Sequence, residues 1–230
     1  MDERIGFIGA GAMAEALARG LVASGRAPAT IIASDPLPEQ REKFAALGVL
    51  VAADDVELVG RADTIVLAVK PPALEHVLAE IAPHVVSGKL VVTIAAGVRT
   101  QDVRRSLPQA SVVRAMCGAA CLVGKGVSVL YADELVAPPD RARAERLCEA
   151  YGISLWVPDE RSQETAAALG SSGTACFFRL CETLTAAAID AGLPAQAASR
   201  IMRHTFLGAA MLADARRDIE ELHTIVEEAI

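Results

Sequence analysis

The residues best placed to do chemistry lie at the start of the chain, in a glycine-rich turn. The apolar run 5–8 leads directly into Gly9-x-Gly11-x-x-Ala14, and a helical pattern follows at once. Strand, tight glycine turn and helix is the order that a dinucleotide site requires. Gly9 lets the chain turn, and Gly11 lets the backbone approach a pyrophosphate at the positive end of the helix. A plain glycine turn is the alternative; the position at the start of a βαβ unit favours the cofactor site.

Further candidate cofactor residues follow the ends of other predicted strands. Asp35 ends the strand 31–34, where an acid can hydrogen-bond the ribose hydroxyls or cap the helix that opens at Pro36. The nearest following arginine is Arg41, and this spacing favours NAD over NADP. Lys70 is either a cofactor contact at a strand end or an ordinary surface lysine. The predicted cofactor-binding residues are Gly9, Gly11, Ala12, Met13, Asp35, Ala68, Val69, Lys70, Pro71, Ala95, Ala96 and Gly97.

The elements that must position these residues alternate along the first 157 residues. Short apolar strands are predicted at 5–8, 31–34, 49–52, 64–69, 90–94, 111–115, 126–131 and 155–157. Helices are predicted at 13–24, 54–60, 74–81, 100–107 and 140–151, with another closing at 43–47 and with Thr100 as the N-cap of its helix. This alternation predicts an α/β fold, a Rossmann-type doubly wound sheet.

After Pro158 the strand pattern stops and long helical patterns begin. We expect one helix over 160–191, interrupted around 170–173, a second over 195–212 and a third over 219–230. These helices are apolar on more than one face, and about 70 residues of helix cannot bury that surface alone. The sequence therefore predicts a dinucleotide-binding domain over 1–158 and an all-helical dimerisation and substrate domain over 159–230, packed against a second subunit.

The amino-acid composition argues against several functional classes. The chain has 230 residues, is 53% hydrophobic and carries a net charge of −7 without a long basic run, which argues against a nucleic-acid partner. It holds no uncharged apolar stretch long enough to span a membrane. Five cysteines without a secretion signal predict reduced thiols in the cytoplasm. No histidine lies near Cys117 and Cys121 in sequence, so no metal site is expected.

Several segments in the same order resemble the pyrroline-5-carboxylate reductase family. They are residues 6–16, Ala68-Val69-Lys70-Pro71, Ile94-Ala95-Ala96-Gly97-Val98, Val112-Val113-Arg114-x-Met116, Asp190-Ala191-Gly192-Leu193-Pro194 and Thr205-x-x-Gly208-Ala209-Ala210-Met211-Leu212. The resemblance implies NAD(P)H-dependent reduction of a cyclic imine, a small molecule, to a cyclic amino acid. It also implies a homodimer with interlocked helical domains, which often assembles further.

Three segments depart from the family pattern. The family's Met-Pro-Asn-Thr-Pro loop is Met116-Cys117-Gly118-Ala119-Ala120 here, and its Ser-Gly-Ser-Gly-Pro-Ala-Tyr turn is Gly170-Ser171-Ser172-Gly173-Thr174-Ala175-Cys176. The sequence also ends at Ile230, before a counterpart of the family's Ser-Pro-Gly-Gly-Thr-Thr segment. On these departures we expect an altered substrate, with very slow or absent reduction of pyrroline-5-carboxylate and intact cofactor binding.

The resemblance also implies roles on the substrate side. Ser172 or Thr174 would be the catalytic hydrogen-bond donor to the imine. Glu160 matches a family glutamate near the substrate; the alternative is an acid at a helix N-terminus that interacts favourably with the helix dipole. The other expected substrate-side residues are Met116, Cys117, Gly118, Ser171 and Gly173. Two alternatives remain: a nucleotide-binding homologue that has lost the chemistry, and a dehydrogenase of C–OH bonds. The second is disfavoured because residues 160–191 contain no lysine to act as general acid.

Overall fold

A computed structural model of the chain describes residues 3–216, apart from the side chains of Ser171 and Arg216. The chain divides into two compact units between Ser171 and Ser172. This division falls inside a long helix, α7 (Glu160–Asp190). The domain boundary expected after residue 158 lies just before that helix and stays a prediction.

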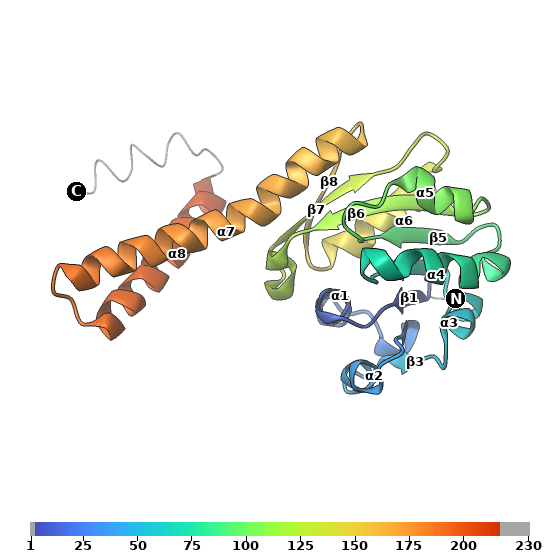
Figure 1. Ribbon diagram of the computed structural model, residues 1–230, viewed down its shortest axis with the longest axis horizontal. Coiled ribbons are helices and arrows are strands. Elements are labelled where there is room, and N and C mark those ends of the chain that lie inside the picture. The colour runs from blue at the N-terminus through green and yellow to red at the C-terminus, as the bar shows by residue number, and fades with distance from the viewer. Residues whose placement is uncertain (1–2, 217–230) are drawn as a thin grey trace. The chain divides into compact units, whose positions relative to one another are not determined.

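The first unit is built on an eight-stranded sheet in the order β3-β2-β1-β4-β5-β6-β7-β8 (Figure 1). Neighbouring strands are parallel except β6 and β7, which are antiparallel. Every residue of β1, β2, β4 and β5 is buried, as strands covered on both faces must be. The strands are β1 Ile5–Ile8, β2 Ile31–Ser34, β3 Leu50–Val51, β4 Thr64–Leu67, β5 Leu90–Thr93, β6 Ser111–Cys117, β7 Gly126–Tyr131 and β8 Gly152–Trp156.

Helices cover both faces of this sheet. Leu17 of α1, Phe44 of α2 and Leu147 of α6 share one apolar core. A second core holds residues of α3, α4 and α5. The helices are α1 Ala12–Ala23, α2 Pro38–Ala45, α3 Asp55–Arg61, α4 Pro71–Ile81, α5 Thr100–Ser106 and α6 Pro138–Glu149, with short 3-10 helices at Pro28–Thr30, Ala82–His84 and Ala119–Val123. Two cores on opposite faces confirm the predicted doubly wound class.

Several element ends differ from the prediction for local reasons. The strand expected to reach residue 69 ends at Leu67, and α4 begins at Pro71, because proline fits the first helical turn but not a central strand. Thr100 is the first residue of α5 and not its N-cap, which is Arg99. The predicted N-cap was therefore wrong by one position, and the side chain of Thr100 has another partner, described below.

In the second unit, α7 pairs with α8 (Ala195–Arg216). The interruption expected around residues 170–173 does not occur, since glycine costs only about 1 kcal/mol within a helix and neither Gly170 nor Gly173 adopts a positive φ. After α7, Gly192 turns the chain at a φ of 100°. Phe206 of α8 then lies 5.9 Å from the ring of Phe177. The third predicted helix, 219–230, lies outside the described residues.

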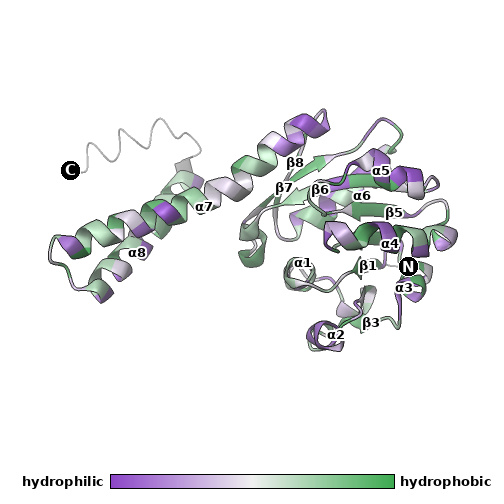
Figure 2. Cartoon of the chain, in the orientation of Figure 1, coloured by the Kyte–Doolittle hydropathy of each residue, from purple (hydrophilic) through white to green (hydrophobic). Residues whose placement is uncertain are grey.

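Many apolar side chains of α7 and α8 stay exposed although the two helices pack against each other. Phe177, Leu180, Ile201 and Leu207 are each 55% exposed, and Met211 is 64% exposed. Figure 2 shows hydrophobic residues along both helices, with hydrophilic residues between them. A set of exposed apolar residues of this size is typical of a surface that another protein chain covers. Between residues 3 and 216, no helix combines the length and the apolar character needed to cross a membrane.

Candidate functional site

The carboxyl ends of β1, β2 and β4 meet at one cleft. Ile8 pairs with Ser34 and with Leu67, so the three strands end level and the residues that follow them share one edge of the sheet. The cleft has a volume of about 640 Å³, within the range of ligand pockets. Six of the predicted cofactor residues line it: Gly9, Gly11, Asp35, Ala68, Val69 and Lys70.

The two glycines of the turn are needed for different reasons. Gly9 has a φ of 91°, and a Cβ there would lie 2.9 Å from the carbonyl oxygen of Ala68, so the fold itself requires glycine. Gly11 has an ordinary φ of −71°, and a Cβ there would meet nothing within 4 Å. Gly11 is also the N-cap of α1, and no side chain caps that end of the helix. The open space thus adjoins a helix N-terminus, the kind of position that binds phosphate.

Asp35 joins the glycine turn to the end of β2. Its carboxylate accepts hydrogen bonds from the backbone N–H of Ala10 at 2.8 Å and of Leu37 at 2.9 Å. The alternative role as the cap of the next helix is wrong, because α2 begins at Pro38 and its N-cap is Leu37. The Arg41 guanidinium donates to the backbone carbonyl of Asp35 at 2.6 Å, which places an arginine at the same end of the cleft.

Acidic residues that the sequence reasoning missed also line this cleft. They are Asp54, Asp55 and Glu80, and the Ser34 hydroxyl donates to Asp55. Burial raises the pKa of Asp55 and the nearby charges of Glu80, Asp54 and Asp35 raise it further, against the hydrogen bond from Ser34. Asp54 and Asp55 follow the third predicted strand, so their place at a carboxyl end was a signal that could have found them.

The remaining predicted cofactor residues are not part of the cleft lining. They are Ala12, Met13, Pro71, Ala95, Ala96 and Gly97, and their roles stay predictions. Lys70 lines the cleft and is also exposed, as the residue just before α4. Both of its expected descriptions, a surface lysine and a residue beside the cofactor, are therefore compatible with its place.

The predicted substrate-side residues at the end of β6 and just after it line a smaller cavity of about 50 Å³. Met116, Cys117 and Gly118 form one wall, and Ala166 and Gly170 of α7 are part of the other. A Cβ on Gly118 would lie only 3.5 Å from the carbonyl oxygen of Gly170, so the two backbones pass closely. Among the residues whose side chains the structure describes, no carboxylate, amide or hydroxyl group contributes to the lining. The segment thus presents methyl groups, backbone and one thiol.

Glu160 was expected near the substrate or beside its own helix dipole, and its hydrogen-bond partner is a residue of neither kind. Its Oε1 accepts hydrogen bonds from the backbone N–H of Thr100 at 2.8 Å and from the Thr100 hydroxyl at 3.0 Å. A carboxylate from the start of α7 therefore caps the N-terminus of α5. The two residues are far apart in sequence, so no local pattern could predict the pair.

The proposed catalytic residues lie along α7. Ser172, Gly173 and Thr174 belong to the second unit, and all three have helical backbone, as does Ser171 at the end of the first unit. Ser172 is exposed. Their roles toward a substrate stay predictions.

Comparisons with known proteins identify the family. Residues 4–97 match the family described as NADP oxidoreductase, coenzyme F420-dependent, and residues 160–228 match pyrroline-5-carboxylate reductase dimerisation. A pyrroline-5-carboxylate reductase of Pseudomonas aeruginosa is 41% identical over 91% of this chain and 78% of its own length. The chain belongs to the pyrroline-5-carboxylate reductase family. The Haemophilus influenzae reductase is 34% identical over 90% of this chain and 77% of its own length.

Solved structures of pyrroline-5-carboxylate reductases agree with this assignment. The enzyme of Coxiella burnetii superposes with a TM-score of 0.92 at 33% identity, over 97% of this chain and 84% of its own. The Plasmodium falciparum pyrroline carboxylate reductase, solved with NADP bound, superposes with a TM-score of 0.83 over 96% of this chain and 82% of its own. At 23% identity, that second likeness shows the shared fold.

Proposed function

We propose that this chain reduces the C=N bond of a small cyclic imine with a hydride from NAD(P)H. Membership of the family makes it an NAD(P)-dependent oxidoreductase that acts on C=N bonds. The observation that carries the proposal is the turn at Gly11, which leaves open space beside an uncapped helix N-terminus. That space fits a pyrophosphate, because backbone N–H groups and the helix dipole both favour an anion there.

The residues of the cleft bind and orient the cofactor in this proposal. The turn at Gly11 and the first N–H groups of α1 hold the pyrophosphate, and Asp35 lies where the ribose hydroxyls would bind. The exposed ammonium of Lys70 faces the same cleft and offsets the charge of the phosphates. The nicotinamide supplies the hydride, while the chain supplies position and electrostatics.

On the substrate side, the Ser172 or Thr174 hydroxyl donates a hydrogen bond to the imine nitrogen. Such a bond strengthens as the nitrogen gains electron density, and one donor of this kind contributes about 3–4 kcal/mol to the transition state. The expectation rests on the family resemblance of residues 170–176. Asp35 further leads us to expect that NADH binds more tightly than NADPH, because a 2′-phosphate would meet its carboxylate.

The substrate that we infer is less polar at one end than pyrroline-5-carboxylate. The family's Asn and Thr are replaced by Gly118 and Ala119, and the described side chains that line the cavity beside this segment include no amide or hydroxyl. A polar substrate group placed there would lose hydrogen bonds to water without gaining a partner. A cyclic imine with an apolar substituent at that position fits the lining better.

The exposed faces of α7 and α8 support a homodimer. The match to the dimerisation family covers both described helices of the second unit. Real interfaces bury more than about 1,000 Å², and light scattering that shows a stable monomer at micromolar concentration would contradict the dimer. Assembly of dimers into larger oligomers and a cytoplasmic location stay predictions.

One experiment in two stages tests the proposed function. A thermal-shift titration with NADH and with NADPH comes first, and we expect a rise in melting temperature with both. The second stage follows NAD(P)H absorbance with a panel of cyclic imines that includes pyrroline-5-carboxylate. We expect the faster turnover with the less polar imines. A cofactor-dependent shift without turnover on any imine would favour the nucleotide-binding homologue, and equal turnover with pyrroline-5-carboxylate at about 10 s⁻¹ would refute the altered substrate.

A further inference from the structure

A hollow of about 840 Å³ lies at the amino edge of the sheet, where β1, β2, β4 and β5 begin. Arg4 comes just before β1 and Asp63 just before β4, while α6 contributes Arg143 and Arg146 and α3 contributes Arg61. The volume is within the range of ligand pockets. Because these parallel strands run from this edge to the other, the hollow and the cofactor cleft lie at opposite edges of the sheet. We call it the amino-edge hollow.

Positive charge exceeds negative charge in the amino-edge hollow. The charged residues of its lining are four arginines and two acids: Arg4, Arg61, Arg143, Arg146, Glu3 and Asp63. The whole chain has a net charge of −7, so this excess of arginine is local. An excess of one sign in a concave surface raises the local concentration of ions of the opposite sign.

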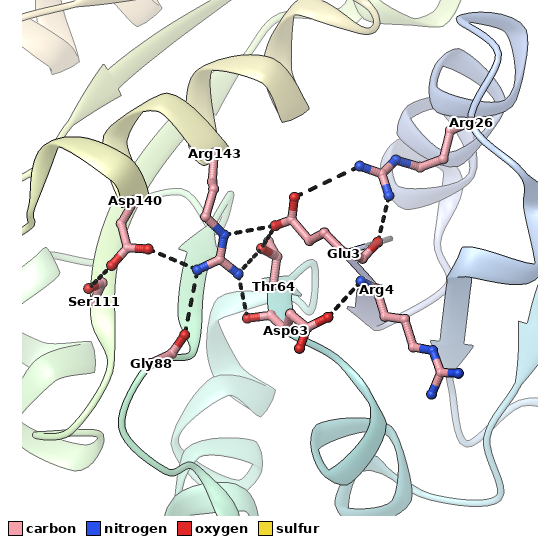
Figure 3. Close-up of polar contacts among 9 residues, drawn as sticks. All are labelled: Glu3, Arg4, Arg26, Asp63, Thr64, Gly88, Ser111, Asp140 and Arg143. Atoms are coloured by element: carbon pink, nitrogen blue, oxygen red, sulfur yellow. Dashed lines mark hydrogen bonds and ion pairs between the residues drawn. The ribbon is translucent and has the colours of Figure 1, made fainter. Parts of the chain in front are cut away.

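Two of the four arginines have carboxylate partners. The guanidinium of Arg143 forms ion pairs with Glu3 and with Asp140 (Figure 3). Among the described residues, Arg61 pairs with Glu57 alone, one helical turn earlier in α3. Both members of this second pair are well exposed, and such a pair contributes little. The centre of the hollow is therefore satisfied by the protein itself, whereas Arg61 stays available to a stronger partner.

The other two arginines, Arg4 and Arg146, differ from these. Within residues 3–216, neither guanidinium has a hydrogen bond or an ion pair. The Asp63 carboxylate accepts a hydrogen bond from the backbone N–H of Arg4 at 2.8 Å, and the side chain of Arg4 points away from the bonded network (Figure 3). Both residues are exposed. The hollow thus presents two unpaired guanidinium groups that come from different elements.

We propose that the amino-edge hollow binds the diphosphate group of a small molecule through Arg4 and Arg146. A guanidinium is a planar fork of N–H donors that matches the oxygens of a phosphate and keeps its charge at any physiological pH. Two linked phosphate groups can reach two guanidinium groups on different elements, which a single anionic group does less well. Arg61 can turn from its exposed pair to give a third contact.

The charge of the whole chain favours a small anion over an extended one. A net charge of −7 repels a long polyanion such as nucleic acid, whereas a small diphosphate can stay within the basic hollow. The site lies at the opposite edge from the turn at Gly11, so both can be occupied at once. This binding site goes beyond the proposed function and does not rest on it.

Titration of inorganic pyrophosphate into Gly11→Val protein tests the site. The turn at Gly11 could bind the same group, and this variant removes that competing site. Isothermal titration at an ionic strength of about 0.1 M should give one site with a Kd below about 1 mM. A parallel titration with ADP shows whether a nucleoside adds affinity to the diphosphate. The native chain saturated with NADH replaces Gly11→Val if that variant does not fold.

A matched pair of double variants makes the test decisive. Arg4→Gln combined with Arg146→Gln should weaken pyrophosphate binding at least about tenfold. Arg19→Gln combined with Arg105→Gln removes the same charge from exposed arginines outside the hollow, and should weaken it less than about twofold. Circular dichroism checks that each variant is folded.

Three results would overturn the proposal. An equal loss in both double variants would mean that only the general field of the protein attracts the anion. Absence of binding to the Gly11→Val protein would exclude the site directly. Binding to the native chain that NADH displaces would place the pyrophosphate in the cofactor cleft. Failure of NADH to bind, by contrast, would count against the proposed function and leave this site intact.

Discussion

The two edges of the sheet differ in how their charged groups are used. At the amino edge, Arg143 of α6 donates to the Glu3 carboxylate at 2.9 Å, to Asp140 at 2.8 Å, to the Asp63 carbonyl at 2.9 Å and to the Thr64 hydroxyl at 3.0 Å (Figure 3). Burial lowers the pKa of Arg143, but the bonds to Glu3 and Asp140 outweigh it and raise the pKa. The guanidinium thus ties α6 to β4 and to the segments just before β1 and β4.

At the carboxyl edge the arrangement is the reverse. Asp35 and Asp55 have protein partners, but the first turn of α1 has no side-chain cap and Gly11 faces open space. Size does not separate the two edges, because the hollow at the amino edge measures about 840 Å³ against 640 Å³ for the cleft. The difference is that central charged groups of the amino edge satisfy each other, whereas the carboxyl edge leaves backbone N–H groups for a ligand.

The largest effect that we predict is a loss of cofactor affinity at the carboxyl edge. Gly11→Val fills the open space with a side chain, so affinity for NADH should fall by about a thousandfold, which corresponds to about 4 kcal/mol. The unfolding free energy should fall by only about 1 kcal/mol, from the poorer N-cap. Isothermal titration and urea unfolding measure the two quantities. Gly60→Val is the matched control, since a Cβ there also meets nothing and Gly60 lies outside the cleft; unchanged affinity in a folded Gly11→Val protein would remove the cofactor assignment.

Gly9→Ala tests the neighbouring glycine, whose role is structural. The added Cβ would clash with the Ala68 carbonyl oxygen, and the backbone of residue 9 has a φ of 91°, which strains a residue with a side chain. The unfolding free energy should therefore fall by about 3 kcal/mol. Urea unfolding compares it with Gly60→Ala, for which we expect a small gain in stability from helix propensity. If Gly9→Ala lowered the unfolding free energy no more than Gly60→Ala does, the turn would be able to relax around the added Cβ. Gly9 would then not differ from Gly11 in being required by the fold.

Arg143→Met tests the amino edge. It removes the cation that Glu3 and Asp140 share and leaves Glu3 with Arg26 and Thr64 and Asp140 with Ser111. The unfolding free energy should therefore fall by about 2–3 kcal/mol while NADH affinity stays the same. Arg146→Met, an exposed arginine one turn further along α6, is the control and should change stability by less than about 0.5 kcal/mol. A fall in NADH affinity with Arg143→Met in the folded protein would mean that the two edges are coupled.

Asp35→Asn sharpens the description of the cleft. The amide oxygen can still accept one of the two backbone hydrogen bonds, but the charge that would repel a 2′-phosphate is gone. The ratio of NADPH to NADH affinity should rise about tenfold, or about 1.4 kcal/mol. Titrations at one ionic strength measure it, with Asp54→Asn as a control in the same cleft. An unchanged ratio would show that Asp35 acts only through the turn.

The smallest predicted effect is a pH dependence. The raised pKa of Asp55 means that the folded state holds this proton more tightly than the unfolded chain, so stability falls as the pH rises from 3.8, the ordinary value, through the raised pKa. Asp55→Asn keeps an acceptor for Ser34 without the charge. At neutral pH the unfolding free energy of this variant should therefore exceed that of the native chain by less than about 1 kcal/mol, since solvent screens part of the repulsion among the carboxylates. Urea unfolding at about pH 4 and pH 7 checks this, and an equal difference at both values would contradict it.

Much of the fold followed from the sequence because its signals are local. The apolar runs at 31–34 and 126–131 match β2 and β7 residue for residue, and most other strand ends differ by two residues or fewer. Glycine and proline mark these ends, and their backbone limits act on immediate neighbours. The glycine turn and Asp35 were recognisable for the same reason: a strand end and the turn after it are adjacent in the chain.

The tertiary structure alone decided the contacts between distant residues. Glu160 caps Thr100, and Arg143 reaches Glu3 across a separation of 140 residues, and neither pair follows from periodicity or spacing. The continuity of α7 through Gly170 was likewise beyond local propensity, since a penalty of about 1 kcal/mol per glycine is small beside the hydrogen bonds of a 31-residue helix. Residue types along the chain determine what each segment can form; the order of the strands in the sheet determines which side chains then meet.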